Sequence, residues 1–292
     1  MERVLITTPY VGELGWCVFS WAPMVHAAAL AQPWDKVIVY TRPGRSLLYP
    51  YATEVRPNPL GPEHESECLL WHGFDEEMSK QYNAMIDQVV AQGKEEFGPE
   101  TVVFSIASLK QFNQAFYDKG KPCLLKLPEG KRPVTGDKLR PINVLCTRDR
   151  GMSDYRNWAP ENWRKLADSL PGTVIVVGKS EREYVWKEAF ADCDVDRISN
   201  RINKTSINDL VRLFSVADIA IGGSTGTLHL ASSCACDHLV WGGEKEIHRY
   251  AETNWFGARH HVLSIGWDPE VEQIANAIKE FSSSKPVSSQ DG

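Results

Sequence analysis

The chain of 292 residues lacks the short motifs that mark several large enzyme classes. It has no G-x-G-x-x-G fingerprint, so a nicotinamide cofactor is not expected, and no G-x-x-x-x-G-K-[ST] loop, which argues against an ATPase or kinase. No D-x-D triplet directly follows an expected strand, and the pair His260-His261 has no companion cluster of carboxylates. The sequence therefore predicts no cofactor and no bound metal.

Long apolar runs and dense basic segments are missing too. No stretch is long enough to span a bilayer, and the N-terminus runs straight into a strand instead of a signal peptide. The net charge is −6 and the pI is about 5.8. Because nucleic-acid-binding proteins usually carry a basic face, no nucleic-acid partner is expected. We predict a cytoplasmic protein whose contact with a membrane is at most peripheral.

Cysteine pairs suited to a metal site or to redox chemistry are also absent. The seven cysteines are odd in number and irregular in spacing, with no C-x-x-C pair, and Cys234-Ala-Cys236 has the wrong spacing for zinc. Buried free thiols in a reducing compartment are the simplest interpretation.

An alternation of apolar strands and helices is what the chain does have, and it predicts an α/β fold. A segment rich in Pro, Gly and Lys at residues 120–141 interrupts this pattern, which then restarts. We therefore predict two Rossmann-like lobes, at residues 1–130 and 131–281, followed by a disordered Ser-rich tail at residues 282–292. Strands are expected at residues 4–7, 36–41, 101–105, 142–147, 173–178, 219–221 and 238–241.

The most informative segment is Asp218-Ile-Ala-Ile-Gly-Gly-Ser-Thr-Gly-Thr-Leu-His-Leu-Ala-Ser233. It predicts a buried strand, a glycine-rich turn, and a helix that begins at Ser224 or Thr225. Free N–H groups and the helix dipole at such a start form a seat for phosphate, and the hydroxyls of Ser224, Thr225 and Thr227 lie within the same turn. His229 could bond a phosphate or a ribose, although a buried helix histidine is an equal alternative.

Other polar residues also follow expected strands, where ligands of parallel sheets bind. Arginines occupy the loop 147–158 and could grip a phosphate, with Arg–Asp pairing in a solvated loop as the alternative. Glu244 could bind a ribose hydroxyl, and a charged turn is the alternative. Glu13 could act as a general base, and the alternative is a carboxylate that stabilises the start of a helix. The candidate donor-side residues are Arg148, Arg150, Arg156, Lys179 and Glu244, and the candidate acceptor-side residues are Gly12, Glu13 and Trp16.

These segments together resemble the GT-B glycosyltransferases, and among them the ADP-heptose:lipopolysaccharide heptosyltransferases. The resemblance lies in the opening strand, Gly12-Glu13 and Pro23, in Asn157-Trp-Ala-Pro-Glu-Asn-Trp163, and above all in Thr225-Gly-Thr-Leu-His-Leu-Ala231. It implies two lobes with the active site in the cleft between them, and an inverting, metal-independent sugar transfer. It further implies that Glu13 is the base, where the family has Asp, and that Thr225, Gly226 and Thr227 contact the donor phosphate.

The sequence thus predicts a glycosyltransferase that uses a nucleoside-diphosphate sugar. Its acceptor would be a glycan, a glycolipid or another molecule with a free hydroxyl. Two alternatives stay open: a sugar-nucleotide epimerase or hydrolase on the same fold, and a non-enzymatic protein that binds nucleotide sugars.

Overall fold

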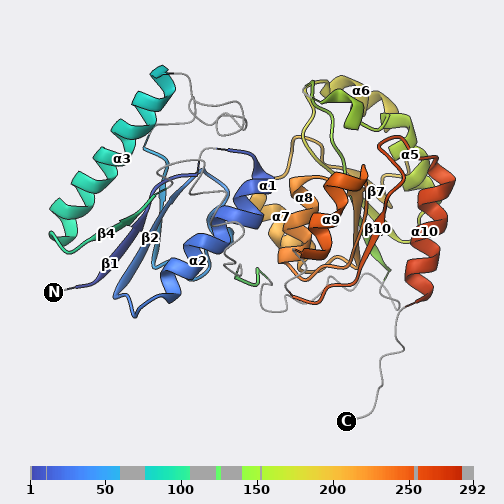
Figure 1. Cartoon of the computed structure of the whole chain (residues 1–292). Coiled ribbons are helices and arrows are strands. Elements are labelled where there is room, and N and C mark those ends of the chain that lie inside the picture. The colour runs from blue at the N-terminus through green and yellow to red at the C-terminus, as the bar shows by residue number, and fades with distance from the viewer. Residues whose placement is uncertain are drawn as a thin grey trace, which may run out of the picture. The chain divides into compact units, whose positions relative to one another are not determined.

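The computed structural model describes residues 2–10, 12–59, 76–105, 123–125, 140–151, 153–252 and 256–284. The chain divides into two compact units (Figure 1). Unit 1 comprises Met1–Leu127, Ser206–Arg212 and Ser233–Ala235, and unit 2 comprises Pro128–Thr205, Leu213–Ser232 and Cys236–Gly292. Most of the predicted linker, Cys68, and residues 285–292 of the predicted tail lie outside the described residues.

Unit 1 is built on a four-stranded sheet in the order β3-β2-β1-β4, with all neighbouring strands parallel. Figure 1 shows helices α2 and α3 on opposite sides of this sheet. Parallel strands covered on both faces are expected to be continuously apolar, as β1 and β2 are. The bounds are β1 Val4–Thr7, β2 Lys36–Thr41, β3 Glu54–Pro57, β4 Val102–Phe104, α1 Leu14–Trp16, α2 Ala22–Leu30 and α3 Glu76–Phe97.

The helical segment after β1 is irregular just before Pro23. A π-helical turn over Cys17–Trp21 joins α1 to α2, and the N–H of Ala22 bonds to the carbonyl of Cys17, five residues back. Pro23 follows at once, and its ring cannot donate a bond to the carbonyl four residues earlier. The π-helical turn therefore lies where proline interrupts the regular backbone hydrogen bonds of an α-helix.

Unit 2 contains a six-stranded parallel sheet in the order β10-β9-β8-β5-β6-β7. In Figure 1, α8 and α9 lie on one side of it, and α5, α6 and α10 on the other. The strands are β5 Ile142–Cys146, β6 Thr173–Val177, β7 Ile198–Asn200, β8 Ile219–Gly223, β9 His238–Trp241 and β10 His260–Leu263. The helices are α5 Pro160–Ser169, α6 Glu183–Ala189, α8 Gly226–Ser233, α9 Glu244–Glu252 and α10 Val271–Ser283, while α7, Ile207–Phe214, contributes residues to both units.

Tryptophans dominate the core between the sheet of unit 2 and α5, α6 and α10. Trp163, Trp186 and Trp241 are each at most 2% exposed. On α5, Trp163, Leu166 and Ala167 follow the i, i+3, i+4 spacing that puts one face of a helix on the sheet. Removing one such ring would cost about 3–5 kcal/mol, so these side chains fix the framework on which the loops stand.

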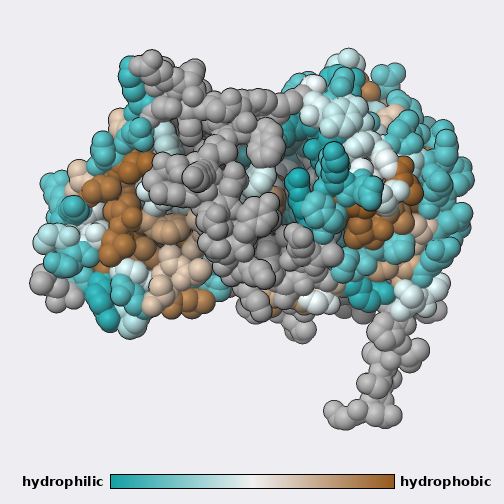
Figure 2. Space-filling view, in the orientation of Figure 1, coloured by the Kyte–Doolittle hydropathy of each residue, from teal (hydrophilic) through white to brown (hydrophobic). Residues whose placement is uncertain are grey.

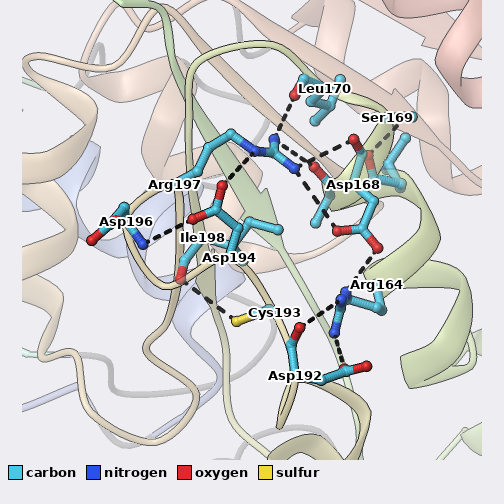
Figure 3. Close-up of polar contacts among 12 residues, drawn as sticks. Arg164, Asp168, Ser169, Leu170, Asp192, Cys193, Asp194, Asp196, Arg197 and Ile198 are labelled. Carbon is cyan, nitrogen blue, oxygen red and sulfur yellow. Dashed lines mark hydrogen bonds and ion pairs between the residues drawn. The ribbon is translucent and has the colours of Figure 1, made fainter.

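Arginines tie the C-terminal end of α5 to the segment before β7 (Figure 3). Arg197 donates to the carbonyls of Ala167 at 3.1 Å and Leu170 at 2.6 Å, groups that the end of a helix leaves unbonded. Arg164 pairs with Asp168 and Asp192 at 2.8 and 2.7 Å. Because exposed ion pairs contribute little, the carbonyl bonds of Arg197 matter most here.

Apolar side chains reach the surface of unit 1. Figure 2 shows hydrophobic residues gathered on the face of unit 1 seen there, and Leu30 and Val102 of this unit are 71% and 45% exposed. Within the described residues, we find no helix with the length and apolar character needed to cross a bilayer.

Candidate functional site

The central feature of unit 2 is the junction between β5 and β8, its two middle strands. From β5 the chain continues to β6 on one side, whereas from β8 it continues to β9 on the other side. In open parallel sheets, ligands bind outside the carboxyl ends of the strands at such a switch point. A pocket lies at this position, lined by Cys146, Arg148, Arg156, Trp158, Trp163, Gly223, Ser224, Thr225, Trp241 and Trp267.

The turn after β8 forms one wall of the pocket. A Cβ at Gly222 would lie 2.5 Å from the carbonyl oxygen of Cys146, so only glycine lets β8 approach β5 this closely. The helix that follows begins at Gly226, one or two residues later than the sequence predicts. The N–H groups of Ser224 and Thr225 bond to the Trp241 carbonyl and the Tyr250 hydroxyl. The first helical N–H groups, those of Gly226 and Thr227, are the ones a helix start leaves for a ligand.

Tyr250 of α9 holds this turn from behind. Its hydroxyl accepts the N–H of Thr225 and donates to the carbonyl of Thr225, both at 3.0 Å, and it lies 3.4 Å from Ser224 Oγ. Burial raises the pKa of Tyr250 to about 12, so the hydroxyl keeps its proton. The ring of His229 stacks in parallel on the Tyr250 ring, with 4.3 Å between centroids. Tyr250 and His229 therefore form a rigid support for the turn after β8.

His229 is itself buried, at 4% exposure, and is not among the residues that line the pocket. Burial, followed by Arg249 and His238, lowers the pKa of His229 to about 3, so the imidazole is neutral. The structure therefore favours a packing role for His229 over a direct bond to a phosphate or a ribose.

Arginines from the loop after β5 form the second wall. Arg156 donates from Nη2 to the carbonyl of Ser224 and lies over the ring of Trp267, 4.3 Å from its centroid. Arg148 donates to the Ser153 carbonyl at 2.9 Å and to Asn157 Oδ1, which fixes its guanidinium at the pocket. Two cations thus meet the turn of β8, although 68 residues separate Arg156 from Ser224 in the sequence.

Three polar atoms of the residues that line this pocket are buried without a hydrogen-bond partner among the described residues. They are Nε of Arg156 and Nε1 of Trp163, both donors, and Oγ1 of Thr225, which can donate or accept. Burying a polar group without a partner costs about 1–3 kcal/mol, so native proteins rarely leave one unless a ligand or water completes it. With the amides of Gly226 and Thr227 and the two guanidinium groups, these atoms suit a ligand with several anionic oxygens.

Trp267 completes the pocket on the side of β9 and β10. A Cβ at Gly242 would lie 3.0 Å from Trp267 Cη2, so the glycines after β9 leave room for the indole. Tyr155 meets the same indole edge-on, with 6.3 Å between the ring centroids. The indole therefore orients Arg156 and offers an apolar surface beside it.

The same turn reads as G-x-S-x-G at Gly222–Gly226, the pattern of a serine-hydrolase nucleophile. Ser224 is only 6% exposed, and its Oγ lies beside the Tyr250 hydroxyl. A nucleophilic serine needs a base that takes its proton, and no histidine bonds to Ser224 in the described part of the chain. The turn therefore does not have the geometry of a nucleophile elbow.

Other predicted donor-side residues are not among these lining residues. Lys179 is exposed on the loop after β6, and Glu244 is exposed at the first position of α9. Arg150 does not line the pocket, although its backbone bonds to Asn157. The structure therefore brings Arg148, Arg156, Ser224 and Thr225 together, but not Lys179 and Glu244 with them.

The predicted acceptor-side residues lie in unit 1, after β1. Glu13 is half-buried immediately before α1, and Trp16 is half-buried and packs on Phe19 with 4.8 Å between ring centroids. Gly12 is buried against Tyr10, where a Cβ would lie 2.5 Å from the phenol oxygen. β1 is a switch strand of its own sheet, because it lies between β2 and β4.

Sequence reasoning missed Tyr250 and Trp267. The only signal for Tyr250 was the spacing of Ile247 and Tyr250 on one face of a charged segment, and Trp267 follows β10, a strand that the sequence did not predict. No group of three or more His, Cys, Asp or Glu side chains within the described ranges could hold a metal ion.

Comparisons with known proteins agree with this architecture. Three solved structures match nearly the whole chain at low identity: a Veillonella parvula glycosyl transferase of family 9 (TM-score 0.60, 11% identity, 97% of this chain and 98% of that chain), E. coli ADP-heptose lps heptosyltransferase II (0.57, 12%, 96% and 98%), and E. coli heptosyltransferase WaaC with ADP (0.53, 16%, 97% and 99%). They confirm the predicted GT-B fold. A search of curated proteins finds no match.

The family model "Glycosyltransferase family 9 (heptosyltransferase)" matches residues 69–236. The match includes the arginine loop and the turn of β8 but not Gly12, Glu13 or Trp16. Since it extends over more than half of the 292 residues, the chain is a glycosyltransferase that belongs to glycosyltransferase family 9.

Proposed function

We propose that this glycosyltransferase moves a sugar from a nucleoside-diphosphate sugar to an acceptor hydroxyl, with inversion and without a metal ion. The observation that carries the proposal is the pocket at the β5/β8 switch point, where Arg156 Nε and Thr225 Oγ1 are buried and have no hydrogen-bond partner in the part of the chain that the structure describes. The diphosphate binds there against the N–H groups of Gly226 and Thr227, and Arg148 and Arg156 neutralise its charge. Because WaaC was solved with ADP, ADP is the first nucleotide to test.

The chemical step is one displacement at the anomeric carbon. The acceptor oxygen forms a bond to this carbon, while the bond from the carbon to the phosphate oxygen breaks and the diphosphate leaves with the electron pair. Glu13 takes the proton of the acceptor hydroxyl. The guanidinium groups and helix-start amides stabilise the negative charge that develops on the leaving oxygen. A single displacement inverts the configuration, and these fixed donors supply the stabilisation that a metal ion gives elsewhere. The acceptor is a glycan, a glycolipid or another hydroxyl-bearing molecule.

Titration of ADP, UDP and GDP by calorimetry, with and without EDTA, tests the donor site. Arg156→Gln removes a charge-assisted contact worth about 1.5–3 kcal/mol, so the affinity should fall roughly 10- to 150-fold. Arg201→Gln is the matched control, because Arg201 is exposed and, among the described residues, its side chain bonds only to Ser199 Oγ. Equal affinity of Arg156→Gln and the wild type would refute the assignment, and loss of binding in EDTA would refute metal independence.

Glu13→Gln tests the base. The variant keeps the size of the side chain but cannot accept a proton, so turnover should fall by about 10²–10⁴ while the dissociation constant for the nucleotide stays the same. Full turnover would exclude Glu13 from this role.

Nucleotide release in the presence and absence of acceptors separates the transferase from the two alternatives. An epimerase or hydrolase would consume the donor without an acceptor. A binding protein would be stabilised by the nucleotide but would release none from its sugar.

A further inference from the structure

Asp149 is a buried carboxylate that the proposed reaction does not use. It lies in the loop after β5, directly after Arg148, which lines the pocket. The residue is only 3% exposed. Withdrawing a carboxylate from water is costly, so a buried one is seldom kept unless an opposite charge and hydrogen bonds compensate it.

Three side chains that follow β6 in the sequence hold this carboxylate. Oδ2 accepts hydrogen bonds from Ser180 Oγ at 2.5 Å and from Trp186 Nε1 at 3.1 Å. Oδ1 accepts one from Arg182 Nη2 at 2.5 Å, which is also an ion pair. Burial raises the pKa of Asp149, but these hydrogen bonds and the charge of Arg182 lower it by more, so the pKa lies below its ordinary value and the group stays ionised.

These contacts attach the loop after β5 to the framework of unit 2. Trp186 of α6 is 0% exposed and stacks on Phe190 within the core. The backbones of Asp149 and Ser180 also form a parallel bridge, which continues the pairing of β5 with β6 beyond the two strands. Arg148 is the residue just before this bridge, so its backbone is fixed by a neighbour whose side chain reaches the core.

The guanidinium of Arg148 is held by the same loop. It donates to the Ser153 carbonyl at 2.9 Å and to Asn157 Oδ1. The Asn157 side chain also accepts the N–H of Arg150 at 3.3 Å and donates to the Arg150 carbonyl at 2.8 Å. The residues on both sides of Asp149 are therefore braced within the loop, and Asp149 attaches that loop to the rest of the unit.

We propose that Asp149 is a positioning residue for the diphosphate and that it acts through Arg148. The inference rests on the proposed function, because it concerns how the pocket receives the nucleotide. While Asp149 is bound to Ser180, Arg182 and Trp186, the guanidinium of Arg148 meets the diphosphate without first having to be ordered. Arg182 is exposed and is not among the residues that line the pocket, yet it contributes to nucleotide affinity through this carboxylate.

Calorimetry on the full chain tests the proposal. ADP, UDP and GDP are titrated into the wild type, and the one that binds most tightly is the probe for the variants. Asp149→Asn turns one carboxylate oxygen into an amide nitrogen, which cannot accept a hydrogen bond, so the affinity should fall about 3- to 30-fold. Arg182→Gln removes the counter-charge and should lower the affinity about 2- to 10-fold. The double variant should bind no more weakly than Asp149→Asn alone, because both changes break one ion pair.

A second cycle separates positioning from general damage to the loop. In an Arg148→Gln background, Asp149→Asn should change the affinity less than about 2-fold, since the group through which it acts is gone. Damage to the whole loop would also displace Arg156, and the effect would then persist. Urea unfolding shows that each variant is folded, and the exposed site of Arg182 offers a milder change than the buried one.

Asp192→Asn is the matched control. It breaks the ion pair of Asp192 with Arg164, 2.7 Å long and in the same unit (Figure 3), and neither residue lines the pocket, so the affinity should not change. The proposal is overturned if Asp149→Asn and Arg182→Gln both bind the probe as the wild type does. It is also overturned if the loss persists in the Arg148→Gln background, or if the control loses as much affinity.

Failure of the proposed function has a different signature. If the wild type binds none of the three nucleotides, the donor site itself is wrong, and this inference falls with it. If the wild type binds and Arg148→Gln weakens binding, but the Asp149 and Arg182 variants do not, the donor site stands and only the positioning role is refuted.

Discussion

Replacement of Tyr250 by Phe is the sharpest test of how the turn after β8 is held. The variant keeps the ring that stacks on His229, but it removes the hydroxyl that accepts the Thr225 N–H and donates to the Thr225 carbonyl. A buried group that loses its partner costs about 1–3 kcal/mol. Thr225 is half-buried, so water can replace part of the loss, and we expect about 1–2 kcal/mol. For a domain of this size, that corresponds to a fall of roughly 2–8 °C in the unfolding temperature.

Urea unfolding followed by tryptophan fluorescence measures this change, because Trp163, Trp186 and Trp241 are buried in the core of unit 2. Calorimetry with ADP gives the second readout. A looser turn should also weaken the binding of ADP, since the ligand must then order Gly226 and Thr227. Tyr184→Phe is the matched control, because Tyr184 is 69% exposed. If Tyr250→Phe matches the wild type in both stability and ADP affinity, the support assigned to its hydroxyl does not exist.

Three further perturbations test the framework around the site. Gly222→Ala places a Cβ 2.5 Å from the Cys146 carbonyl oxygen and should lower the free energy of unfolding by about 1–3 kcal/mol, whereas Gly151→Ala, which meets only a side-chain oxygen at 3.3 Å, should not. Arg197→Met removes the hydrogen bonds to the carbonyls at the end of α5, and it should lower the free energy of unfolding in urea by about 1–3 kcal/mol. The control Lys187→Met removes only an exposed ion pair and should lower it by under about 0.5 kcal/mol. Burial lowers the pKa of His229 and His238 to about 3 and about 4, so below pH 6.5 the unfolded chain binds protons that the folded chain does not. Stability should then fall by up to about 1.4 kcal/mol per histidine per pH unit between pH 6.5 and pH 4, and His229→Phe should flatten this fall while the exposed His248→Gln leaves it unchanged.

The central strands could be predicted from sequence, because burial on both faces makes them continuous apolar runs. Val4–Thr7, Lys36–Thr41 and His238–Trp241 have the predicted bounds. The strands that sequence reasoning missed lie at sheet edges: β3, β7 and β10. An edge strand has fewer apolar residues, as the half-buried His260–Leu263 shows, so its pattern does not stand out from a loop.

The candidate site likewise contains residues that could be predicted from the sequence and residues that could not. Arg148, Arg156, Ser224 and Thr225 could be predicted because each follows a recognisable strand, and they do meet at one pocket. The residues that support and complete the pocket could not. Tyr250 acts through one hydroxyl on α9, a helix that the sequence analysis did not predict, and Trp267 enters the pocket only because of tertiary packing.

The position of β5 and β8 in the middle of their sheet has a consequence for motion. Local opening of a protein starts at frayed edges, where few contacts must break, and reaches central strands last. In unit 2 these edges are β7 and β10, so the amides of β5 and β8 should exchange with deuterium among the slowest in the unit. The two walls of the pocket therefore stand on the part of unit 2 that opens least often, and a ligand meets them already assembled.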